Sequence, residues 1–310
     1  MPGRNFNIDR HLLPLVVSAL FMVGSSLYLS WGLPWWQILA SVVSVLVVAY
    51  SVYRFTNLYA SGFNHAIPFI FVILAFSLPD IITFSKESIA PILFILSVYY
   101  SVKFSYKSYQ NDLAFIVTFF LTCSAILFPP LVWCSVIFLI SNYVRAEKRL
   151  KYVVMSLCGI IVPVLLYFGA TYIFFGFESV RDTAVAMYDK MISISGFNGE
   201  IIAATLFKLF VLSVMAIASI IVILRNLNTF NISRHRAMIR GIVYLIFLIA
   251  DMVLFSSVGT VAFWCSISAL LTIIYYDALC CHIENRTGVF VLVFFLCAIL
   301  AERTIALMVA

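Results

Sequence analysis

The feature that most constrains this chain is a succession of apolar runs, each near the length of a membrane span and separated by a few polar, prolyl or charged residues. A helix needs about 20 apolar residues to cross the hydrocarbon core of a bilayer. Of the 310 residues, 64% are hydrophobic and 10% are charged, whereas soluble domains are roughly 45–50% apolar and about 25% charged. Because a water-soluble surface cannot be built from this composition, the sequence predicts an all-α, polytopic membrane protein.

Proline, glycine and charge clusters divide the apolar sequence into eleven predicted spans. These lie near residues 12–30, 35–53, 66–84, 88–102, 113–127, 131–144, 152–175, 201–224, 239–256, 260–276 and 289–309. The first is longer than the apolar region of a signal peptide and has no small-residue cleavage site, so we interpret it as a retained span. Breaks at 31–34, 128–130 and 256–260 separate runs that are too long for one crossing. No linker is evident, and residues 1–310 are predicted to form a single integral membrane domain.

The basic residues predict an orientation. With the N-terminus inside, 14 of the 19 Lys and Arg residues fall on inner segments and three fall on outer segments. This is the bias of the positive-inside rule. If residues 128–130 were a kink within one helix, the later segments would invert and the counts would become seven inside and ten outside. The hairpin at 128–130 is therefore favoured, and it places the C-terminus outside.

One outer segment, residues 176–200, is longer than the other connections. Its apolar residues recur at helical intervals between Glu178 and Ser195: Val180, Ala184, Met187, Met191 and Ile194. This spacing is typical of an amphipathic helix that lies on a membrane surface. A plain polar connector is the alternative.

Four charged residues fall inside predicted spans, where charge is costly and commonly functional. Lys208, Glu302 and Arg303 lie roughly 10 Å below the outer end of their spans at a rise of 1.5 Å per residue. Asp251 lies roughly 8 Å below the outer end of its own span. The sequence therefore predicts an outer-leaflet layer that holds two cations and two anions.

Two interpretations of this charged layer stay open. In the first, Lys208 and Asp251 neutralise each other, while Glu302 and Arg303 extend to the headgroups. In the second, a polar cavity opens to the outer leaflet, with Asp251 or Glu302 as a catalytic acid or base and Lys208 or Arg303 binding a phosphate. Asp80, on the predicted outer rim, is a third candidate catalytic carboxylate.

Several classes of function lack support in the sequence. The basic residues sit in short clusters between apolar runs and form no basic face, which argues against nucleic-acid binding. Cys280-Cys281-His282 has no second ligand pair nearby, so no metal site is predicted. No phosphate-binding loop, nucleophile elbow, zinc-protease motif or dinucleotide fingerprint occurs, and no cofactor is predicted.

Two resemblances add expectations. The segment Leu127-Phe128-Pro129-Pro130-Leu131, the basic cluster 145–151 and Gly159-Ile160-Ile161-Val162-Pro163 resemble a family of bacterial inner-membrane proteins described only as a domain of unknown function. This resemblance extends over about residues 50–175, through Asn57-Leu58 and the region 68–79. It implies a multi-pass protein of the bacterial cytoplasmic membrane and no particular activity.

The span number and the outer helix are similar to the membrane cores of C-type glycosyltransferases. That similarity implies an outer-leaflet cavity and a sugar donor linked to polyprenyl phosphate. Those enzymes usually have an acidic residue in the first outer loop, whereas residues 31–34 contain no carboxylate. From the charged layer and this similarity, we expect a protein that binds, or transfers a group from, a lipid-linked phosphate substrate at the outer leaflet. The alternatives are a small-solute transporter and a non-enzymatic scaffold or assembly factor, and whether the chain is an enzyme stays open.

Overall fold

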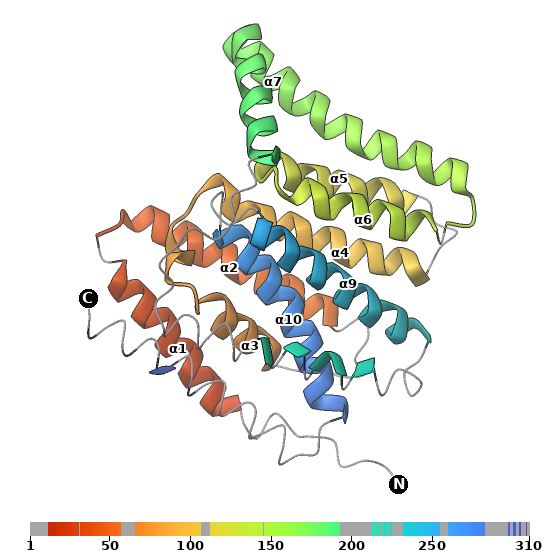
Figure 1. Ribbon diagram of the computed structural model, residues 1–310. Coiled ribbons are helices and arrows are strands. Elements are labelled where there is room, and N and C mark those ends of the chain that lie inside the picture. The colour runs from red at the N-terminus through yellow and green to blue at the C-terminus, as the bar shows by residue number, and fades with distance from the viewer. Residues whose placement is uncertain are drawn as a thin grey trace. The chain divides into compact units, whose positions relative to one another are not determined.

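The computed structural model describes residues 12–30, 32–56, 66–106, 112–144, 146–192, 232–254 and 260–282, with further scattered residues between 213 and 224 and between 297 and 308. Over these residues the regular structure is entirely helical and contains no strand (Figure 1). The prediction of an all-α protein is therefore confirmed.

The chain divides into two compact units. Unit 1 is Met1–Phe84, Gly199–Ile242 and Ile267–Ala310, and unit 2 is Ser85–Asn198 and Val243–Ser266. Two helices pass from one unit to the other, α9 (Ile232–Leu254) and α10 (Thr260–His282).

Unit 1 is built around α3 (Ala66–Ala75), which packs against both α1 (Leu12–Leu29) and α2 (Trp35–Thr56). The helix break predicted at 31–34 is confirmed by the end of α1 and the start of α2. Apolar side chains at helical intervals on α2, including Val45, Val48 and Val52, are buried. The buried hydroxyl of Ser41 donates to the carbonyl oxygen of Ile82 at 2.6 Å. Helix α2 therefore also contacts the segment that follows α3.

The predicted span at 66–84 is not one continuous helix. Helix α3 ends at Ala75, and a short 3-10 helix, η2 (Pro79–Ile82), follows after a turn. Pro79 has no N–H to donate, and its ring disfavours the helical conformation of the preceding residue. Proline therefore ends the helix although the sequence stays apolar.

Unit 2 consists of α4 (Ala90–Tyr106), α5 (Asp112–Leu127), α6 (Leu131–Tyr143) and α7 (Arg149–Ile192), together with parts of α9 and α10. Helices α5 and α6 contact each other across the connection 128–130 and lie side by side (Figure 1). The predicted hairpin is therefore present. The third predicted break, at 256–260, lies almost wholly outside the described residues.

Helix α7 has two arms. Gly176, with φ 82° and ψ 179°, separates an upper arm, 149–175, from a lower arm, 177–192 (Figure 1). These dihedrals are essentially restricted to glycine. The amphipathic helix predicted within 176–200 is thus helical as far as Ile192, and its last predicted residues lie outside the described part of the chain.

A glycine brings α7 against α5. Tyr152, Ser156, Gly159 and Pro163 recur at helical intervals and are the buried residues of α7. A Cβ atom at Gly159 would lie 2.6 Å from the carbonyl oxygen of Phe115 and would also overlap the hydroxyl of Thr118. The two helices can therefore approach this closely only because residue 159 has no side chain.

The opposite side of α7 is apolar and exposed. Its outward stripe includes Leu150, Leu157 and Leu165, which are 51–80% exposed. Exposed apolar stripes of this kind mark contact with lipid or with another protein. Three described segments are long and apolar enough to cross a membrane: Trp35–Thr56, Lys86–Phe104 and Arg149–Ile192. Several other apolar helices are shorter, so the count of eleven spans and the orientation of the termini stay predictions.

We expect Gly159→Ala to lower the melting temperature in detergent, because the added methyl group must displace Thr118 and the Phe115 carbonyl at a cost of about 1–3 kcal/mol. Gly169→Ala is the matched control on the same arm, since a Cβ atom there meets nothing within 4 Å. The control should be neutral or slightly stabilising. Equal melting temperatures for the two variants would contradict the tight α5–α7 contact.

Candidate functional site

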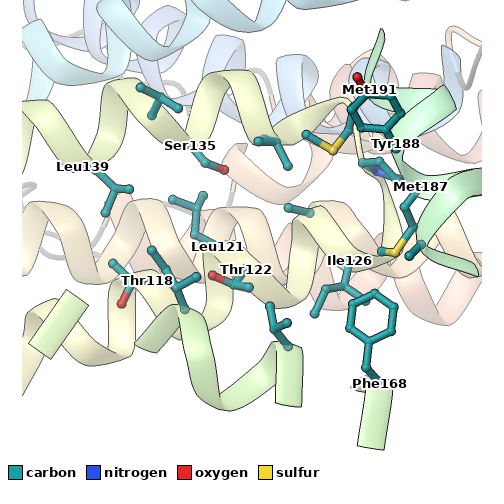
Figure 2. Close-up of a pocket in the computed structure, with 17 residues that line it drawn as sticks. Thr118, Leu121, Thr122, Ile126, Ser135, Leu139, Phe168, Met187, Tyr188 and Met191 are labelled. Carbon is teal, nitrogen blue, oxygen red and sulfur yellow. The ribbon is translucent and has the colours of Figure 1, made fainter. Parts of the chain in front are cut away.

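A cavity of about 380 Å³ lies within unit 2, between the α5–α6 hairpin and both arms of α7 (Figure 2). Helix α5 lines it with Thr118, Thr122 and Ala125, and α6 lines it with Ser135 and Leu139. The upper arm of α7 adds Ile160, Val164 and Phe168, which follow directly after the contact at Gly159.

The lower arm of α7 forms another wall of the cavity. Ala184, Met187, Tyr188 and Met191 line it, all from one face of this helix (Figure 2). Ala184, Met187 and Met191 belong to the apolar face predicted from the sequence. That face therefore lies toward a cavity of the protein itself.

The walls of the cavity are apolar. Among the described residues that line it, none is charged. The hydroxyl of Thr118 donates to the carbonyl oxygen of Ala114 at 2.9 Å, and that of Ser135 donates to the carbonyl oxygen of Leu131 at 2.7 Å. These two protons are used within their own helices. Thr122 and Tyr188 add two further hydroxyl groups, and the remaining described side chains of the lining are apolar. The cavity therefore suits a mainly apolar group.

Two polar contacts fasten the far end of the lower arm. Lys190 Nζ lies 3.0 Å from Glu87 Oε1 in an ion pair. Glu87 belongs to the 3-10 helix η3 (Lys86–Ile89), where the backbone N–H of Ser85 donates to Ser88 Oγ at 3.1 Å. In addition, the indole Nε1 of Trp133, on α6, donates to the carbonyl oxygen of Met191 at 3.1 Å.

A buried polar cluster lies among α4, α6 and α9. Ser101 donates to Asn142 Oδ1 at 3.0 Å, and the oxygen atoms of Ser101 and Tyr244 are 3.2 Å apart. Since the single proton of Ser101 goes to Asn142, Tyr244 is the donor to Ser101. The ring of Tyr244 stacks on Phe138 with a centroid distance of 3.5 Å. Each of these residues is at most 1% exposed.

Asp251, seven residues after Tyr244 on α9, is 6% exposed and lies near the start of α6. Its carboxyl group accepts a hydrogen bond from the backbone N–H of Cys134. The N-terminal end of a helix favours a neighbouring negative charge. Among the described residues, Oδ2 of Asp251 has no hydrogen-bond partner.

Helix α6 separates these two features. Cys134, Phe138 and Asn142 lie on its buried face, toward Asp251 and the polar cluster, whereas Val132, Ser135 and Leu139 line the cavity. Successive residues of an α-helix are about 100° apart around its axis, so these two sets of neighbouring residues face in different directions. Asp251 is therefore not a wall of the cavity.

Five residues were predicted for the charged layer and its rim, and the structure describes the backbone of two of them, Asp80 and Asp251. Asp251 is buried as described, and Asp80 lies in η2, where its side chain is outside the described part of the structure. Lys208, Glu302 and Arg303 all lie outside the described residues. The predicted pairing of Lys208 with Asp251 and the charged layer as a whole stay predictions. No three His, Cys, Asp or Glu side chains within the described ranges come together as metal ligands.

Sequence reasoning missed the cavity and the Ser101–Asn142–Tyr244 cluster. A signal for the cavity was present, because Thr118, Thr122 and Ala125 recur at intervals of four and three residues beside a predicted hairpin. Small side chains on one face of a helix leave a depression that a neighbouring helix need not fill. No comparable signal identified Tyr244, since its partners are more than 100 residues away in the sequence.

Comparison with known proteins finds no matching protein family, no matching curated protein and no matching solved structure. The two resemblances noted from the sequence therefore stay expectations.

We expect Tyr244→Phe to lower stability by about 0.5–1.5 kcal/mol, because the ring can still stack on Phe138 while the hydrogen bond to Ser101 is lost. Tyr172→Phe is the control, since Tyr172 is 59% exposed. Unfolding of both variants in the same detergent measures the difference. A Tyr244→Phe variant as stable as the control would show that this hydrogen bond contributes nothing.

Proposed function

We propose that this chain is a multi-pass protein of the bacterial cytoplasmic membrane that binds the apolar tail of a lipid-linked substrate in the cavity between α5, α6 and α7. The observation that carries the proposal is the cavity itself, about 380 Å³ in volume and lined by no charged side chain among the described residues. Sites for small ligands are commonly cavities of about 300–1,000 Å³ with mostly apolar walls.

The membrane setting is supported by the apolar helices. An outward stripe on α7 and a second on α2, with Trp35, Leu39 and Leu46 more than half exposed, suit contact with lipid. A lipid tail in the bilayer could therefore reach a cavity formed by such helices without crossing water. This favours a lipid over a water-soluble apolar ligand.

The predicted orientation would place the cavity toward the outer leaflet. Residues 176–200 form an outer segment when the N-terminus is inside, and the lower arm of α7 both belongs to this segment and lines the cavity. The positive-inside bias thus supports an outer-leaflet site.

The volume favours one chain. A volume of about 380 Å³ is near the lower end of the range for small-ligand sites and suits part of one acyl or prenyl chain. Among the described residues that line the cavity none is cationic, so the proposal assigns only the apolar tail to it. Phosphate binding by Lys208 and Arg303, and group transfer by Asp251, Glu302 or Asp80, stay a separate proposal from the sequence.

We expect Ala184→Phe to weaken binding of a dodecyl phosphate photoprobe at least tenfold, because the phenyl ring enters the space that the tail would occupy. Ala186→Phe is the matched control, since Ala186 is an exposed residue of the same arm and does not line the cavity. Binding is measured by photocrosslinking followed by peptide mapping. Equal labelling in wild type and both variants, or labelling away from α5, α6 and α7, would refute the proposal.

The orientation has its own test in a chain whose seven native cysteines are replaced. We expect Asp182→Cys, on the lower arm, to react with a membrane-impermeant maleimide in intact spheroplasts. Lys148→Cys should react only after the membrane is opened. Both positions are exposed, so accessibility within the protein is matched. The reverse pattern would invert the predicted topology.

A further inference from the structure

The lower arm of α7 differs from the other cavity walls in how it is held. The α5–α6 hairpin and the upper arm are fixed by the 128–130 connection and by the contact at Gly159. The lower arm continues from the upper arm through Gly176, whose φ and ψ interrupt the helix at this residue. Bending at Gly176 would therefore move the lower arm without disturbing the other walls.

Two polar contacts between the lower arm and the rest of unit 2 lie at its far end. Lys190 and Met191 lie 14 and 15 residues beyond Gly176, or roughly 21 Å along a helix. The ion pair between Lys190 and Glu87 is partly open to its surroundings, since the two side chains are 40% and 19% exposed. Exposed ion pairs are weak. The hydrogen bond from Trp133 Nε1 is also exposed. Both contacts can therefore break without disrupting a packed core.

We propose that residues 177–192 are a hinged lid over the cavity, which turns about Gly176, is latched by the Glu87–Lys190 ion pair and the Trp133–Met191 hydrogen bond, and opens to admit a lipid tail. This inference rests on the proposed function. In the described position of the lid, Met187, Tyr188 and Met191 form one wall of a cavity that is partly open (Figure 2). Turning the lid away would widen this opening between α5, α6 and the upper arm.

A latch and a ligand contact differ in kinetics. A latch that is closed in both the empty and the occupied protein slows entry and release equally and leaves the dissociation constant unchanged. A residue that touches the tail alters the dissociation constant. The latch residues Glu87, Trp133 and Lys190 do not line the cavity, so variants of them test the lid without altering the binding surface.

The experiment measures the rates of binding and release of a fluorescent dodecyl phosphate by the full chain in detergent. Glu87→Gln and Trp133→Phe should each speed both rates about two- to fivefold with an unchanged dissociation constant. Glu178→Gln, an exposed carboxylate of the same arm, is the control and should match wild type. The double swap Glu87→Lys with Lys190→Glu should restore the slow rates.

Hydrogen exchange of the amides in 177–192 provides a readout that needs no lipid. Faster exchange in Glu87→Gln, restored by the double swap, together with faster lipid rates supports the lid. Faster exchange with unchanged lipid rates, or unchanged exchange, overturns it. If wild-type protein does not bind the probe, the proposed function fails and the lid fails with it. If wild type binds while the latch variants behave as wild type, only the lid fails.

Discussion

The close approach of α7 to α5 at Gly159 is the constraint on which the described part of unit 2 depends. Here the backbone of one helix meets Thr118 and the carbonyl of Phe115 on the other with no intervening side chain. In a bilayer the hydrophobic effect does not drive helices together, so packing at small residues supplies much of their attraction. One absent methyl group therefore determines where the upper arm of α7 lies.

The cavity follows from what happens beyond this contact. Pro163, four residues after Gly159, is buried inside α7 and cannot donate a hydrogen bond to the Gly159 carbonyl. The backbone nevertheless stays helical at Pro163, since the non-helical dihedral angles inside α7 are at Gly176. Ile160, Val164 and Phe168, which lie beside the buried row of α7, form the wall of the cavity on this side.

Few polar side chains of unit 2 line this space, and among the described residues those that do carry hydroxyl groups. The hydroxyls of Thr118 and Ser135 donate to carbonyl oxygens of their own helices. The polar groups that bond between helices, Ser101, Asn142 and Tyr244, lie toward the other face of α6. Because a polar group without a partner is costly in an apolar environment, this separation lets one side of α6 specify helix pairing and leaves the other side free to accept an apolar chain.

The sequence was sufficient for features that depend on local rules. Proline and the charge count placed the hairpin at 128–130, and helical spacing identified the arm that carries Ala184, Met187 and Met191. It was insufficient where two distant segments meet. Apolarity alone extended a span through Pro79, and no local pattern indicates that Tyr244 bonds to Ser101. The charged layer was inferred from depth in the membrane, a quantity that cannot place one helix beside another. Asp251 is the one member whose surroundings are described, and its neighbour there is a helix N-terminus.

The helix predicted to lie on the membrane surface and the helix that lines the cavity are the same segment, and its amphipathic pattern suits either role. Such a helix needs an apolar surface beneath it, which either the bilayer or the cavity walls can provide. When the lower arm lies over the cavity, Met187 and Met191 have apolar neighbours from the protein. When it turns away, the headgroup region and acyl chains can cover the same side chains, so opening need not expose them to water. In the proposed lid, apolar surroundings in both positions would keep the free-energy difference between them small, which would let the contacts of Glu87 and Trp133 favour the closed one.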